Sequence, residues 1–149
     1  MRFVKKFLTF IGLVVLLVLG VKFGAENLPY TFDKQRAAAY VGEHAAPKSR
    51  TCCAWYVMRA LHAGGCPVYI LPAYGYEKLL PKMGWEEVDR RGYTPQMGDV
   101  VVFPAIGKHI WGHIQMWDGQ QWVSDFKQRS MIPANAYGQT DWKIYRFPD

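Results

Sequence analysis

The sequence lacks the features that usually accompany nucleotide or nucleic-acid chemistry. It contains no run of Lys and Arg of the nucleic-acid-binding type, no Gly-rich phosphate loop, no internal repeat and no low-complexity tract. We therefore expect no nucleic-acid partner. The net charge of +6 instead favours another anionic partner, such as a membrane surface or the acidic polymer of a bacterial wall.

Cysteine is scarce, with only Cys52, Cys53 and Cys66 in 149 residues. An odd number leaves at least one thiol unpaired even in an exported chain. A helix over 53–63 would hold Cys52 and Cys66 apart, because its rise of about 1.5 Å per residue exceeds the ~7 Å reach of a disulfide within a few residues. We expect no disulfide between them.

The N-terminal segment differs in composition from the rest of the chain. Residues 1–7 are basic, and residues 8–21 form an almost unbroken apolar stretch without a clean cleavage pattern. We expect a signal peptide or signal anchor over 1–24, a linker over 25–32 and one domain over 33–149. The domain would then be exported, either periplasmic or anchored to the inner membrane and facing the periplasm.

The remaining residues predict helices first and strands afterwards. Asp33 is the expected cap of the first helix and Thr51 of the second, and Asp118-Gly119 is the expected turn of a hairpin. This order predicts an α+β fold in which N-terminal helices pack on a small antiparallel sheet. The expected helices cover 34–44, 53–63 and 73–80, the expected strands cover 85–88, 99–103, 112–117, 121–125 and 142–147, and 130–141 is expected to be a loop.

Residues 49–65, SRTCCAWYVMRALHAGG, combine two cysteines with an amphipathic helix that stops at a double glycine. A cysteine in the first helical turn lies where unpaired N–H groups and the helix dipole favour an anion. The sequence therefore predicts a stabilised thiolate, which is the setting of a cysteine nucleophile.

A thiol nucleophile needs a base, and the base needs a group that holds its tautomer. His113 is the better base because it opens a strand behind the small Gly112, whereas His109 lies in a loop suited to contacting substrate. A two-residue hairpin turn would pair His113 with Ser124, and one extra loop residue or a bulge would pair it with Asp125. Asp125 is the stronger candidate chemically, with Ser124 and Gln128 as alternatives.

Three segments occur in an order that resembles a known enzyme class: SRTCCAWYVMRALHAGG, PQMGDVVVF and GHIQMWDGQQWVSDFKQ. The chain is similar to papain-like peptidoglycan hydrolases of the CHAP and NlpC-type families, including the amidase effectors of type VI secretion systems. The resemblance implies a papain-like fold with Cys53 as nucleophile, His113 as base and Asp125 as its orienting group. It also implies a cofactor-free enzyme that hydrolyses an amide bond of peptidoglycan stem peptides through a thioacyl-enzyme. The neighbouring Cys52 and the apolar N-terminal segment depart from that pattern.

Trp111, His109 and Ser49 are the expected substrate-binding residues, and a proteinaceous inhibitor is a further expected partner besides the inner membrane. A zinc site built from both adjacent cysteines, His109 and His113 is disfavoured, because adjacent side chains point apart and the glycines around the histidines oppose a helix. Two other functions stay open. One is a non-catalytic wall-binding or interaction domain of the same fold, and the other is a cysteine hydrolase or acyltransferase with a different substrate.

Overall fold

The computed structural model describes residues 28–149. The expected signal or anchor segment over 1–24 lies outside the described residues, as do residues 25–27 of the expected linker. Within 28–149, no helix combines the length and the apolar character needed to cross a bilayer.

The helices lie close to their predicted positions. They are α2 (Lys34–Glu43), α3 (Cys53–Ala63) and α4 (Tyr76–Lys82), with a 3₁₀ turn, η2 (Ala73–Gly75), leading into α4. Asp33 caps α2 as predicted, since its carboxylate accepts a hydrogen bond from the Arg36 backbone N–H. The prediction for Thr51 is wrong. Cys52 occupies the N-cap of α3 without a side-chain cap, because Thr51 adopts a positive φ of 57° that turns the chain before the helix starts.

The strands form one antiparallel sheet in the order β1-β5-β2-β3-β4. The predicted α+β class, with N-terminal helices on a small antiparallel sheet, is confirmed. A short helix, α5 (Asn135–Gly138), interrupts the expected loop over 130–141. The strands are β1 (Glu86–Val88), β2 (Val100–Phe103), β3 (His113–Trp117), β4 (Trp122–Val123) and β5 (Lys143–Arg146).

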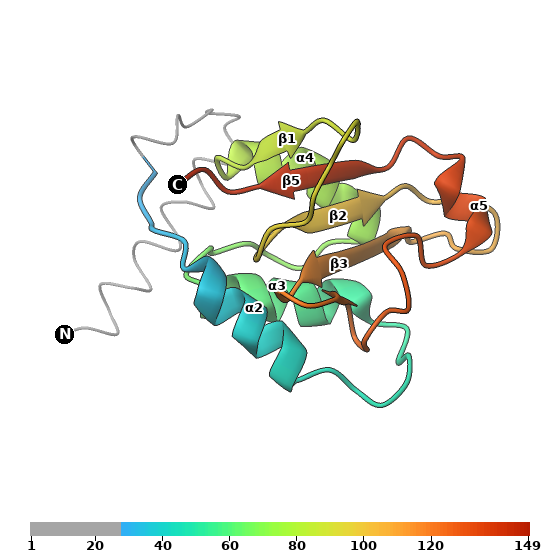
Figure 1. Cartoon of the computed structure of the whole chain (residues 1–149), viewed down its shortest axis with the longest axis horizontal. Helices are drawn as coiled ribbons and strands as arrows, with labels where there is room; N and C mark the ends of the chain where they lie inside the picture. Colours follow the sequence, from blue (N-terminus) through green and yellow to red (C-terminus); the bar gives the residue numbers. More distant parts are fainter. Residues whose placement is uncertain (1–27) are drawn as a thin grey trace.

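The two faces of the sheet are covered differently (Figure 1). On one face, alternate residues such as Val102 and Ile114 join the main core with the apolar sides of α2, α3 and α4. On the other face, Phe103 and Ile144 pack in a smaller core with Tyr137 of α5 and neighbouring loop residues. The helical layer brings the N-terminus of α3 to β3, where the candidate catalytic residues lie.

The β3–β4 hairpin departs from the predicted register. Trp117 pairs with Trp122, so the connecting loop has four residues rather than two or three. The Asp118 carboxylate accepts hydrogen bonds from the backbone N–H groups of Gln120 and Gln121, which closes this wider turn. Because β4 then ends at Val123, neither Ser124 nor Asp125 lies opposite His113 in the ladder.

An ion pair with a fully buried carboxylate ties the sheet together. Asp99, fully buried ahead of β2, accepts hydrogen bonds from Arg146 Nε and Nη2 of β5 at 2.8 and 2.7 Å. It also accepts from the Tyr93 hydroxyl and the Gln96 backbone N–H. A buried carboxylate needs such saturation of its oxygens, and we assign Asp99 a structural role.

Candidate active site

Cys53 is the first residue of α3 and is half-buried between the helix and the sheet. Its thiol lies against the backbone N–H groups of Ile114 and Ala54, which lower its pKa. The N–H of Cys53 itself is in the first helical turn, where N–H groups have no intrahelical acceptor. The sulfur therefore lies beside backbone N–H groups at the start of β3.

The prediction of a stabilised thiolate is not matched by the surroundings of Cys53. Burial is the largest influence and raises the pKa of this thiol above its ordinary value, and the negative charge of Asp125 raises it further. The two N–H groups offset this only in part. At neutral pH the thiol is protonated, so it needs a base to become a nucleophile.

His113 is the first residue of β3, and the preceding glycine fixes where the strand begins. Gly112 has a φ of 68°, and a Cβ there would lie 2.3 Å from the carbonyl oxygen of Phe103. Both the backbone conformation and the close approach require glycine. The His113 imidazole is thereby held at the end of the sheet, at the same end as Cys53.

Gln115 holds the His113 ring. The Gln115 Nε2 donates to the carbonyl oxygen of Met131 at 2.8 Å, so its Oε1 faces His113 Nε2 at 3.1 Å. An acceptor at that position places the ring proton on Nε2 and leaves Nδ1 as the basic nitrogen. Burial lowers the pKa of His113 below its ordinary value, and the contact with Gln115 and the charge of Asp125 offset this shift in part.

Asp125 contacts the segment that leads into α3. Its carboxylate accepts hydrogen bonds from the Arg50 backbone N–H, the Ser49 hydroxyl and the Ser124 hydroxyl, and its carbonyl oxygen accepts from the Ala46 N–H. Among the described residues, no hydrogen bond joins Asp125 to His113. The structure brings Asp125 close to the predicted catalytic residues, but its partners are those of the segment before the helix.

Cys53 and His113 are not hydrogen-bonded to each other within residues 28–149. The thiol contacts the N–H of Ile114, the residue that follows His113, and Asp125 is near enough to raise the pKa of both groups. Catalytic hydrogen bonds are often long or misaligned without substrate. The three predicted residues thus lie in one region.

The predicted substrate-binding residues take different positions. Trp111 is 62% exposed on the segment before His113, and its carbonyl oxygen accepts a hydrogen bond from the Tyr74 N–H. His109 is exposed and lies 5.4 Å from the Tyr137 ring, measured between centroids. Ser49 is engaged with Asp125. Trp111 and His109 therefore remain exposed beside the site, whereas Ser49 supports it.

Sequence reasoning missed Gln115 and Tyr137. Gln115 is a buried polar residue two positions after His113 on the same strand, so strand alternation places both side chains on one face. Tyr137 of α5 is buried, with its ring centroid 6.4 Å from that of His113. Burial, and after it the charge of a Cys53 thiolate, raise the pKa of Tyr137 to about 12. A search for polar i, i+2 neighbours of His113 would have found the first, but nothing local indicates the second.

The described residues contain no group of three or more His, Cys, Asp or Glu side chains placed to hold a metal ion. All three cysteines are free thiols. Cys66 is fully buried, donates to the Tyr30 hydroxyl and has a pKa raised to about 12 by burial, which makes it unreactive. Cys52 is half-exposed and next to the site.

The fold and the site together define a class of α+β protein in which a helix N-terminus presents a cysteine to a strand that begins with histidine. No family model and no curated protein matches the sequence. Two solved chains do, both from type VI effector-immunity complexes Tae3-Tai3 of Ralstonia pickettii. The native form is 31% identical over 78% of this chain and 100% of that chain, with a TM-score of 0.71. The selenomethionine form is 33% identical over 74% and 99%, with a TM-score of 0.68. The chain belongs to the family of type VI effectors represented by Tae3.

Proposed function

We propose that this protein is a cell-wall amidase of the type VI effector class, which hydrolyses an amide bond in peptidoglycan stem peptides with Cys53 as nucleophile and His113 as base. The proposal combines membership of the Tae3 family with the arrangement of the site. The observation that carries it is the position of the Cys53 thiol at the N-terminus of α3. There the thiol lies against the backbone N–H of Ile114, the residue that follows His113 in the chain.

In this mechanism, His113 Nδ1 takes the proton of the Cys53 thiol as the sulfur attacks the peptide carbonyl carbon. The backbone N–H of Cys53 and a neighbouring donor stabilise the oxyanion. Collapse of the tetrahedral intermediate breaks the C–N bond, and His113 returns the proton to the departing amine. Water then attacks the thioester, again with His113 as base, which releases the acid and restores the thiol.

Gln115 supplies the orienting contact that was expected from Asp125. Its Oε1 accepts from Nε2 of His113, which leaves Nδ1 available to Cys53. Asp125 has two other roles in this proposal. It fixes the segment before α3 through Ser49 and Arg50, and its charge keeps the pKa values of Cys53 and His113 higher than they would otherwise be.

The same proposal includes a papain-like fold, a location in the periplasm, a protein inhibitor and a membrane role for the N-terminal segment. We propose that the protein acts in the periplasm, where its peptidoglycan substrate lies. The Tae3 chains are found in complex with an immunity protein. We propose that a protein inhibitor of the same kind binds this chain. The residues 1–24 would reach or hold the inner membrane as a signal or anchor segment.

The direct test is digestion of purified sacculi followed by mass analysis of the fragments. We expect the native protein to release fragments cut at one type of amide bond, and C53A to release none. Release of the same fragments by C53A would overturn the assignment of the nucleophile. Intact sacculi after incubation with the native protein would favour a non-catalytic wall-binding domain.

A further inference from the structure

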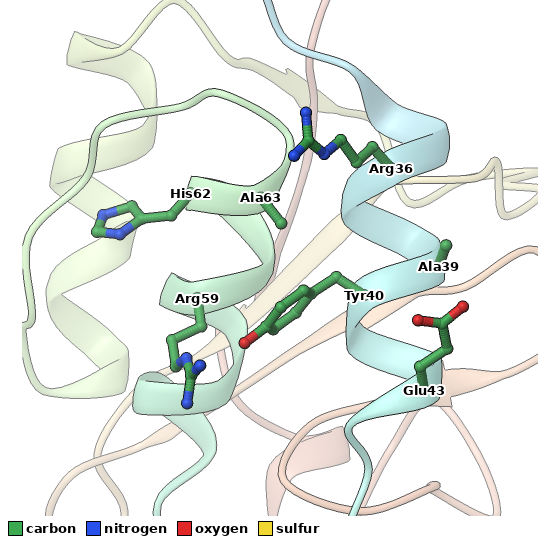
Figure 2. A pocket seen from close by; sticks show the side chains of 7 residues that line it. All are labelled: Arg36, Ala39, Tyr40, Glu43, Arg59, His62 and Ala63. Atoms are coloured by element: carbon green, nitrogen blue, oxygen red, sulfur yellow. The ribbon is translucent and has the colours of Figure 1, made fainter. Parts of the chain in front are cut away.

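A cavity of about 520 Å³ opens between α2 and α3, on the outer side of the helical layer. Figure 2 shows Arg36 and Tyr40 extending from α2 toward α3, and Arg59 lying along α3 beside the Tyr40 ring. Glu43, His62 and two alanines complete the lining. The volume falls in the range of roughly 300–1,000 Å³ that is usual for ligand sites. A smaller cavity next to it is lined by Trp55 and shares Tyr40 and Arg59 with it. We call the two cavities together the α2–α3 groove.

The charge of the groove favours an anion. Arg36 and Arg59 are both exposed, and neither takes part in an ion pair among residues 28–149. Glu43 is the one acidic residue of the lining, so the positive charges are in excess. Guanidinium groups without acidic partners bind carboxylates through paired hydrogen bonds.

Aromatic rings lie next to these charges. Tyr40 and His44 are stacked, with ring centroids 3.8 Å apart and an interplanar angle of 12°, and the Arg59 guanidinium lies over the Tyr40 ring at 5.6 Å. A second cavity of about 120 Å³ continues past these rings to Trp55 and Tyr56. Trp55 is 47% exposed. Flat apolar rings beside free donors suit a ligand with apolar ring faces and polar edges, as in a sugar.

We propose that the α2–α3 groove is a second, non-catalytic binding site for a carboxylate-bearing glycan strand of the cell wall. The choice of ligand rests on the proposed function, whereas the site itself rests on the charges, rings and cavities just described. The groove is on the outer surface of α3, while the Cys53 thiol faces β3. A strand bound there leaves the catalytic side accessible and keeps the enzyme on its polymer.

The groove also follows the helix that carries the nucleophile. Trp55 is in the first turn of α3 and Ala63 is its last residue, so the lining spans about 12 Å at a rise of ~1.5 Å per residue. One end of a bound strand would thus lie near the end of the helix at which Cys53 is found. The groove therefore predicts that its loss slows cleavage of the polymer but not cleavage of a short stem peptide.

The test removes the two positive charges without touching the catalytic residues. R36Q/R59Q is compared with K78Q/K82Q, which removes two exposed charges from α4, both in a C53A background so that the polymer stays intact. Binding is measured by co-sedimentation with peptidoglycan freed of phosphate-bearing polymers. We expect R36Q/R59Q to bind about 10-fold more weakly or worse, because the charge-assisted hydrogen bonds of both guanidinium groups to the carboxylates are lost, and the control to bind like the parent.

Several results would overturn the proposal. One is unchanged binding of peptidoglycan by R36Q/R59Q, and another is an equal loss of binding in K78Q/K82Q. A third is a loss of binding by R36Q/R59Q to phosphatidylglycerol vesicles but not to peptidoglycan, which would assign the groove to a membrane surface. With Cys53 intact, R36Q/R59Q should cleave a short soluble stem peptide at the parental rate and sacculi more slowly. If the parent cleaves neither substrate, the proposed function fails, while the binding comparison still decides whether the groove holds the polymer.

Discussion

His113 and Gln115, two residues apart on β3, are joined by a 3.1 Å hydrogen bond between Nε2 and Oε1. Gln115 is itself fixed, because it is fully buried and its amide nitrogen donates to the Met131 carbonyl. One strand thus supplies both the candidate base and the group that sets its tautomer. Strand alternation places both side chains on one face of the sheet, so the contact does not depend on the register of the neighbouring hairpin.

Replacement of Gln115 by Ala should lower kcat by about 10- to 100-fold. A general base contributes ~10²–10⁴-fold to the rate, and without Gln115 the base would be present but poorly oriented. The Gln115 contact raises the pKa of His113, so its loss should also move the acidic limb of the pH–rate profile to lower pH. Q115E keeps an acceptor on Nε2 and adds charge, which should move that limb to higher pH. A Q115A profile identical to the parent would contradict the orienting role.

The adjacent cysteines offer a matched comparison. C53A should abolish amide hydrolysis, since no other described thiol contacts the Ile114 N–H. C52A removes a half-exposed N-cap residue that makes no side-chain cap bond, and it should retain activity near the parental level. Hydrolysis of a stem peptide with detection of the released amine measures both variants. Inactive C52A with active C53A would exchange the two assignments.

The pH dependence follows from the sign of each shift. His113 must be neutral to act as base, and burial lowers its pKa, so activity should be lost only below the ordinary imidazole value of about 6.5. The charge of Asp125 raises the pKa of both His113 and Cys53. D125N should therefore move the acidic limb to still lower pH and make the Cys53 thiol more acidic.

Alkylation by iodoacetamide at several pH values separates these two effects of D125N. The rate at Cys53 in D125N should rise to its plateau at a lower pH than in the parent, even where kcat falls. C52A is the background for this measurement, since Cys66 is buried and unreactive. A plateau shifted to higher pH would contradict the proximity of Asp125 to the thiol.

Asp99 provides a prediction on stability rather than activity. D99N removes the buried charge that pairs with Arg146, whose side chain is 30% exposed. Loss of a charge-assisted hydrogen-bond partner of this kind costs about 1–3 kcal/mol of unfolding free energy. Urea denaturation measures this loss. D89N, which breaks the exposed pair with Arg91, serves as a control and should leave the midpoint unchanged. Equal midpoints for D99N and the parent would assign Asp99 no role in holding the sheet.

Gly112 tests how His113 is positioned. G112A places a methyl group against the Phe103 carbonyl and demands a positive φ, a backbone strain of roughly 1–3 kcal/mol. We expect both a lower melting temperature and a loss of activity. Gly107 also has a positive φ, of 50°, but at an open site with nothing within 4 Å of an added Cβ. G107A should therefore affect stability but leave kcat near the parental value.

The sequence was sufficient where local periodicity and short-range chemistry determine structure. Helical spacing and the double glycine locate α3 with Cys53 in its first turn, and the cap at Asp33 locates α2. The β-branched run before Phe103 and the alternation around Ile144 locate β2 and β5. The hairpin was mispredicted because the Asp118 side chain closes a four-residue loop, and such side-chain capping is not visible in a two-residue turn signal.

The sequence by itself determined the α+β order of elements, the cysteine at a helix start and the histidine at a strand start, since each depends on residues a few positions apart. Only the tertiary structure decided that Met131 orients the Gln115 amide, that Asp125 holds Ser49 and Arg50, and that burial raises the pKa of the Cys53 thiol. Those outcomes depend on side chains brought together from distant segments and on the solvent they exclude. Neither can be read from local spacing.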